Sequence, residues 1–152
     1  MTSQNYTITI ATLDDLDDLL EIEGLCFESD WFSFNQLANL ITKPKGVFYV
    51  VKHNESAIAY MSLVYRKGVD TVRIYSIAVH PGYRGQNIAK TLIGIAKQYA
   101  IDNGYAGLSL EVKITNEPAL ALYHKMGFVE VAVKPFYYMD GSNAYKMEMR
   151  IN

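Results

Sequence analysis

The residues whose types and spacing could do chemistry begin with a turn, Arg84-Gly85-Gln86-Asn87-Ile88-Ala89, which lies between an expected strand and an expected helix. The first N–H groups of a helix lack intrahelical partners, and the helix dipole adds positive potential at that end. A turn in this place is therefore suited to bind an anion, although an ordinary strand-to-helix loop fits it equally well. The segment holds neither a Gly-x-Gly-x-x-Gly run nor a Gly-Lys-Ser/Thr phosphate loop, which sets aside two common nucleotide-binding turns.

The turn resembles the coenzyme A motif of the GNAT N-acetyltransferases, whose pattern is Gln or Arg, two residues, Gly, one residue, then Gly or Ala. Here the pattern is Arg84-x-x-Asn87-x-Ala89, after Ile-Ala-Val-x-Pro. Later matches to the same family lie at Leu110-Glu111-Val112, at Asn116 and at Tyr123-x-x-x-Gly127-Phe128. The segments Cys26–Ser33 and Phe136–Gly141 resemble the branch that acetylates protein N-termini, such as the ribosomal-protein alanine N-acetyltransferases. The resemblance spans nearly the whole chain.

Asn87 is the one departure from the motif, because it stands where the family has glycine. Glycine suits a pyrophosphate turn since it takes positive φ freely and lets the backbone approach a phosphate closely. Asparagine is the residue that next best tolerates left-handed geometry, so the turn can still form. Its side chain could, however, bond a helix N–H as a cap and compete with a phosphate oxygen. We therefore expect somewhat weaker or repositioned pyrophosphate binding.

The resemblance implies a role for each matching residue. Glu111 would be the general base, directly or through a water molecule, and Tyr123 would be the acid that protonates the coenzyme A thiolate. Asn116 would hold the cofactor arm as well as cap a helix, and main-chain N–H groups of Ile77–Val79 would meet the thioester and the pantetheine. The expected cofactor-binding residues are Ile77, Ala78, Val79, Arg84, Gly85, Gln86, Asn87, Ile88, Ala89, Lys90 and Asn116. Without the resemblance, Glu111 would be interpreted as a solvated strand residue and Tyr123 as a packing residue.

Acetyl-coenzyme A is the co-substrate that the resemblance implies, and the acceptor would be a primary amine. An N-terminal α-amine titrates near ~7.7–8.0 and a lysine near ~10.4, so an α-amine needs less help from a base. Phe27, Trp31 and Tyr138 are candidates for the acceptor groove, because their segments flank a peptide N-terminus in the resembling branch; a local hydrophobic cluster is an equal alternative.

We expect the acceptor to be a protein or peptide N-terminus, that of a ribosomal protein included, held in a groove with open ends and aromatic walls. A small amine such as a polyamine, an amino sugar or an amino acid is the alternative within the same fold, and it would favour an acid-lined pocket. A coenzyme A-binding module that has lost catalysis is a further alternative.

Composition limits the remaining classes of function. A net charge of −2 with scattered Lys and Arg offers no obvious basic face for direct binding of nucleic acid. No apolar run approaches the ~18 residues of a membrane span, and the first residues lack the layout of a signal peptide. Cys26 is the single cysteine and cannot form an internal disulfide, while the histidines show no metal-ligand spacing. These features favour a cytoplasmic protein without a metal, either a monomer or a homodimer.

The elements that must position these residues are mixed in type. The first expected helix, Thr12–Cys26, carries an apolar stripe of Leu13, Leu16, Leu20 and Leu25, and the second, Ser33–Ile41, opens with a Ser33/Gln36 capping box. Two more helices are expected, one at Ile88–Asn103 and one that Thr115 or Asn116 caps and Gly127 ends. The expected strands are Tyr6–Ile10, Val47–Lys52, Ala57–Arg66, Thr71–Val79, Leu108–Val112, Phe128–Val133 and Tyr145–Ile151. This order predicts one domain over residues 1–152 with a mixed α/β (α+β) fold. The resemblance implies the GNAT fold, a mostly antiparallel central sheet of about seven strands flanked by about four helices.

Overall fold

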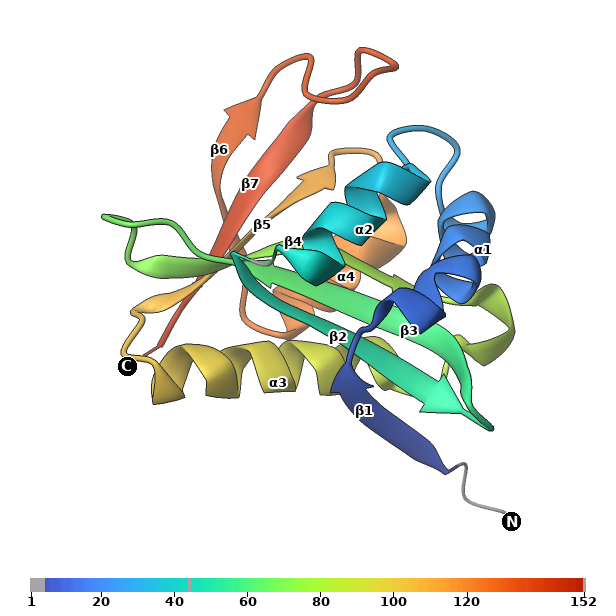
Figure 1. Ribbon diagram of the computed structural model, residues 1–152. Coiled ribbons are helices and arrows are strands. Elements are labelled where there is room, and N and C mark those ends of the chain that lie inside the picture. The colour runs from blue at the N-terminus through green and yellow to red at the C-terminus, as the bar shows by residue number, and fades with distance from the viewer. Residues whose placement is uncertain (1–4, 44, 152) are drawn as a thin grey trace.

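The computed structural model describes residues 5–43 and 45–151. Within them, seven strands form one sheet in the order β1-β2-β3-β4-β5-β7-β6, and four α-helices lie against it (Figure 1). The strands are β1 (Tyr6–Ile10), β2 (Gly46–His53), β3 (Ser56–Val64), β4 (Thr71–Val79), β5 (Gly107–Lys113), β6 (Val129–Lys134) and β7 (Ala144–Arg150). The helices are α1 (Leu16–Cys26), α2 (Phe34–Thr42), α3 (Ile88–Asp102) and α4 (Glu117–Lys125), with short 3-10 turns at Leu13–Asp15 and Pro81–Tyr83. The predicted mixed, mostly antiparallel fold is confirmed.

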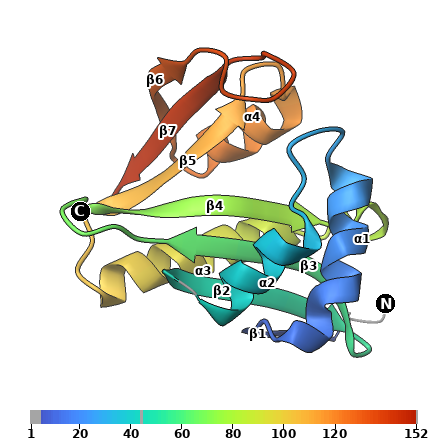
Figure 2. The ribbon, with the colours of Figure 1, turned by 45° about the horizontal axis from the view of Figure 1, so that its top comes forward.

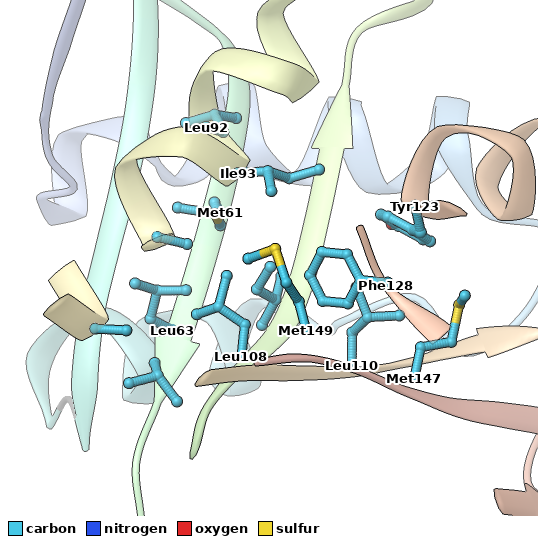
Figure 3. Close-up of a cluster of buried hydrophobic side chains, with 14 of the residues drawn as sticks. Met61, Leu63, Leu92, Ile93, Leu108, Leu110, Tyr123, Phe128, Met147 and Met149 are labelled. Atoms are coloured by element: carbon cyan, nitrogen blue, oxygen red, sulfur yellow. The ribbon is translucent and has the colours of Figure 1, made fainter. Parts of the chain in front are cut away.

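Two buried clusters, one on each face of the sheet, hold the helices in place. Side chains of α1 and α2 pack on one face against residues such as Phe48 and Tyr60. Side chains of α3 and α4 cover the other face, where they meet Leu108, Leu110 and Phe128 (Figures 1 and 3). Alternate residues of a strand point to opposite faces, so β5 sends its leucines to one layer and leaves Ser109 and Glu111 for the other.

The pairing of β4 with β5 is the only parallel pairing in the sheet that the structure describes, and it is short. Thr71–Arg73 pair with Gly107–Ser109, and beyond these residues the two strands diverge (Figure 2). A bulge opposite Ser62 and Leu63 makes Tyr75 an extra residue of β4. The edge of β4 from Ile74 to Val79 is therefore left open on the side of β5.

The first helix differs from the sequence prediction in which of its residues are buried. Leu13 belongs to a 3-10 turn and is 52% exposed, and Leu25 is 50% exposed. The α-helix begins only at Leu16, and its buried residues follow at three- and four-residue spacing, as one face of a helix requires. They are Leu16, Leu19, Ile22 and Glu23. The predicted stripe was thus wrong at its ends, and it missed a buried carboxylate.

Candidate active site

The turn before α3 has the backbone geometry of an anion site. Asn87 and Gly85 both have positive φ, 61° and 82°. Hydrogen bonding within α3 begins where the Thr91 N–H donates to the Asn87 carbonyl at 3.0 Å, so the three preceding N–H groups lack intrahelical partners. A Cβ placed on Gly85 would have nothing within 4 Å, so the space beside the turn is open. Open space, unpaired N–H groups and the positive end of the helix dipole together fit a pyrophosphate.

The conformation of Asn87 agrees with only half of the sequence prediction. The residue takes the left-handed geometry that was expected of it. Its side chain forms no capping hydrogen bond, so the expected bond to a helix N–H is absent, and weaker pyrophosphate binding stays a prediction. Residues that cap a helix with their side chain have an extended backbone, and the left-handed backbone of Asn87 lacks that geometry.

Arg84 ties the turn to the end of β4 and to α1. Its Nε donates to the Val79 carbonyl at 3.3 Å, and its second guanidinium nitrogen lies 3.4 Å from Cys26 Sγ. The Cys26 thiol donates to the same carbonyl at 3.3 Å, and burial raises the pKa of this thiol. The Cys26 thiol therefore stays protonated and joins α1 to the end of β4.

The other expected cofactor residues lie around the gap between β4 and β5. Ile77, Ala78 and Val79 pair with β3 on one side and face the gap on the other. Asn116 caps α4, because its side-chain oxygen accepts the Ala119 N–H at 3.3 Å. The amide NH2 of Asn116 still has donors for a ligand. The α3 turn and the start of α4 thus follow the carboxyl ends of β4 and β5, where the two strands diverge.

Glu111 lies on the α1 and α2 face of β5, and its side chain is only 7% exposed. Its Oε1 accepts from Arg73 Nε at 2.7 Å and its Oε2 accepts from Lys134 Nζ at 2.8 Å. The interpretation of Glu111 as a solvated strand residue is therefore wrong, because cations from the neighbouring β4 and from β6 enclose the carboxylate. Each carboxylate oxygen can accept a second hydrogen bond, which leaves room for a water molecule.

Tyr123 lies in the core cluster under α4, 9% exposed, with its ring edge-to-face with Phe128 at 5.8 Å (Figure 3). Burial raises its pKa to about 12. The Tyr123 hydroxyl forms no hydrogen bond within the described residues. Every fully enclosed side-chain N or O atom of those residues does have a hydrogen-bond partner. The hydroxyl is therefore not completely enclosed. A packing role is confirmed, and the hydroxyl remains available to a ligand.

A cleft of about 570 Å³ opens on the same face as Glu111, bounded by α2 and by the strands from β3 to β7. The predicted acceptor residues do not line it. Phe27 is half-buried and packs under α1, Trp31 is 55% exposed, and Tyr138 is half-buried with its ring edge-to-face with Tyr137. The aromatic residues that do line the cleft, with Glu111, are Phe32, Tyr65 and Tyr75.

Glu23 is a buried residue of this region that the sequence analysis missed. Its Oε2 accepts the Phe32 N–H at 3.2 Å, and its Oε1 accepts the hydroxyl of Tyr60, which also contacts Ser76 Oγ at 2.8 Å. Burial raises the pKa of Glu23. The carboxylate therefore fixes the segment that carries Phe32 against β3 and β4. Helical spacing is the sequence signal that could have predicted the burial of Glu23, because it lies four residues after the core residue Leu19.

A second carboxylate bridges the two segments that were expected to flank the acceptor. Asp30, in the segment between α1 and α2, accepts the Met139 N–H with both oxygens, at 3.2 and 3.3 Å. Met139 lies in the β6–β7 connection, and the two segments are thus joined on this side of the cleft.

In residues 5–43 and 45–151, no helix is both long and apolar enough to span a membrane. The same part of the chain holds no group of three or more His, Cys, Asp or Glu side chains arranged to bind a metal ion.

Comparisons with known proteins agree with this geometry. Residues 16–128 match the model of the Acetyltransferase (GNAT) family. A Bacillus subtilis protein assigned as a ribosomal protein bS18-alanine N-acetyltransferase is 32% identical over 141 residues, which cover 92% of each chain. An N-alpha-acetyltransferase of Saccharolobus solfataricus is 31% identical, with 95% of this chain and 92% of the relative covered. The crystal structure of the ribosomal-protein-S18-alanine N-acetyltransferase from Escherichia coli superposes with a TM-score of 0.83 at 26% identity, covering 97% of this chain and 95% of that one.

Substitution of Asn87 tests the anion site. Glycine adopts the left-handed backbone without strain, so we expect Asn87→Gly to bind coenzyme A at least as tightly as the unmodified protein in calorimetric titration. Asn87→Val should bind about tenfold more weakly, because a β-branched residue in this geometry costs about 1–2 kcal/mol. A large loss of affinity in Asn87→Gly would show instead that the asparagine side chain itself holds the ligand.

Proposed function

The chain belongs to the GNAT acetyltransferase family and is an acetyl-coenzyme A-dependent N-acetyltransferase, and we propose that its acceptor is the N-terminal α-amine of a protein or peptide. The observation that carries this proposal is the lining of the cleft. It has aromatic walls and a single carboxylate, that of Glu111, among its basic residues. Relatives that acetylate N-terminal α-amines, and that match over more than nine-tenths of both chains, support the same acceptor.

The cleft does not have the lining expected for a polyamine. A polycationic acceptor needs several carboxylates to replace its lost hydration, whereas six Lys and Arg line this cleft beside one Glu. A peptide α-amine brings at most one positive charge, and its low pKa lets it enter as the neutral amine. A ribosomal protein N-terminus is one member of this acceptor class, given what the Bacillus relative is assigned to modify.

Glu111 is proposed to take the proton of the attacking amine. The amine must be neutral to react, and an α-amine with a pKa near ~7.7–8.0 loses its proton readily at neutral pH. Because Arg73 and Lys134 already occupy one position on each carboxylate oxygen, a water molecule between Glu111 and the amine fits the remaining acceptor positions. The same two cations hold the carboxylate in place.

The opening between β4 and β5 is proposed to receive the co-substrate, with its pyrophosphate on the α3 turn and its pantetheine along Ile77–Val79. Acetyl-coenzyme A supplies an activated acetyl thioester when it is bound there. The Tyr123 hydroxyl keeps its proton because burial raises its pKa to about 12, and it is proposed to donate that proton to the leaving sulfur. Asn116 contributes amide donors from the start of α4.

A panel of acceptors tests the proposed acceptor class. We expect thiol release from acetyl-coenzyme A with peptides that have a free N-terminus, and at least about tenfold lower kcat/KM with spermidine, an amino sugar or free amino acids. The same peptides with a blocked N-terminus and an internal lysine are the control and should not react. Faster turnover of a small amine would reject the peptide acceptor, and no turnover with any amine would favour a binding module.

Replacement of Glu111 tests its role as the base. Glu111→Gln should lower kcat by about 100-fold or more, and activity should return only toward the pH at which the amine is itself neutral. Glu148→Gln is the matched control, because Glu148 is a salt-bridged residue of the adjacent β7, 17% exposed, outside the cleft. Its rate should stay close to that of the unmodified protein. Equal rates in all three proteins across the pH range would remove Glu111 from the chemistry.

Tyr123→Phe separates catalysis from packing. We expect kcat to fall about tenfold or more while coenzyme A affinity is unchanged, because the ring remains and only the proton donor is lost. The pKa of Tyr123 rises from 10 to about 12, so the folded protein keeps a proton that the unfolded chain loses. Stability should therefore fall between pH 10 and 12 in the unmodified protein, and less so in Tyr123→Phe. Tyr99→Phe, in α3, is the control; a kcat equal to that of the control would leave Tyr123 with packing alone.

A further inference from the structure

The cleft beside Glu111 gathers positive charge that the composition does not predict. The chain has 14 Lys and Arg against 16 Asp and Glu, with a net charge of −2. Six of the 14 cations line the cleft and only one of the 16 acids does. The cations are Lys43, Lys45, Arg66, Arg73, Lys134 and Lys146. They come from separate parts of the chain, and the fold brings them together around one space.

Three of the six cations have carboxylate partners and three have none in the described residues. Arg73 and Lys134 bind Glu111, and Lys146 lies 3.7 Å from Glu148. Across residues 5–43 and 45–151, no carboxylate lies within ion-pairing distance of Lys43, Lys45 or Arg66. We refer to Lys43, Lys45 and Arg66 as the basic wall. A concave surface with an excess of one charge concentrates ligands of the opposite charge.

The basic wall and Glu111 line the same cleft from different elements of the fold. Lys45 precedes β2, and Glu111 lies on β5, three strand spacings away in the order β2-β3-β4-β5. At about 4.8 Å per spacing this separation is about 14 Å. An extended peptide advances about 3.4 Å per residue, so about four residues cover the distance. A peptide whose α-amine lies at Glu111 can therefore reach the basic wall with the side chains of its second to fifth residues.

We propose that the preferred acceptor is an acidic peptide N-terminus, in which Asp or Glu within about the first five residues bind the basic wall while the α-amine lies at Glu111. The inference rests on the proposed function, since it takes the α-amine acceptor as given and adds the charge of the residues that follow. The single carboxylate suits the one α-amine of the substrate, and the unpaired cations suit its carboxylates. A peptide with Lys or Arg at the same positions meets like charge.

Three peptides that differ only in charge test the inference. Each begins with the same residue and continues with four residues that are acidic (Asp and Glu), neutral (Asn and Gln) or basic (Lys and Arg). We expect kcat/KM for the acidic peptide to exceed that of the neutral peptide by about tenfold and that of the basic peptide by more. The preference should shrink as NaCl rises from about 0.05 M to about 0.5 M, because salt screens exposed charges.

Charge reversal locates the preference on the basic wall. Lys43→Glu/Lys45→Glu/Arg66→Glu should reverse the order of kcat/KM, so that the basic peptide exceeds the acidic one, because the wall then carries the opposite charge. Lys97→Glu, on the exposed side of α3, is the control and should keep the acidic preference. If the triple reversal fails to fold, as judged by circular dichroism, the Gln triple variant replaces it and should abolish the preference.

The outcomes separate this inference from the proposed function. Equal kcat/KM for the three peptides, a preference for the basic peptide, or an unchanged preference in the triple variant would each overturn the acidic acceptor while leaving α-amine acetylation intact. Free Asp and Glu are assayed alongside, and faster turnover of these amino acids would assign the wall to a small anionic acceptor instead. Absence of acetylation with every peptide would refute the proposed function itself.

Discussion

Parallel strands β4 and β5 share hydrogen bonds only over Thr71–Arg73 and Gly107–Ser109, and both halves of the candidate site depend on this short pairing. Because β4 turns away from β5, its edge from Ile74 to Val79 keeps backbone groups that no strand satisfies. A ligand laid along that edge can take the place of the missing strand. The helix that connects the two strands, α3, begins at the same opening and adds the positive end of its dipole.

The carboxylate of Glu111 links β4, β5 and β6 on the face of the sheet that α1 and α2 cover. It accepts bonds from β4 through Arg73 and from β6 through Lys134, although it lies on β5. Removing one partner of a buried ion pair is costly because the remaining charge is left without compensation. Glu111 therefore both links the strands and lines the cleft. The stability of a Glu111 variant must be measured as well as its rate.

Features that depend on a few neighbouring residues were predictable. The Ser33/Gln36 capping box forms in both directions, at 2.8 and 3.2 Å. Asn116 caps α4, and Asn87 has the left-handed backbone that its residue type favours. Each of these depends on contacts three or four residues apart or on the φ preference of one residue, both of which are written in the local sequence. The stripe of α1 failed at its ends because a 3-10 turn preceded the helix.

The sequence by itself determined the fold class and the starts of α2, α3 and α4. Only the tertiary structure decided how the polar groups combine. Glu111 meets Arg73 and Lys134 across 38 and 23 residues, and Glu23 meets Tyr60 across 37. Cations that appear scattered along the chain line one cleft, since sheet order rather than chain order sets which of them are neighbours. Local preference acts over a turn of helix, whereas a charged site is made by residues that meet only when the sheet has formed.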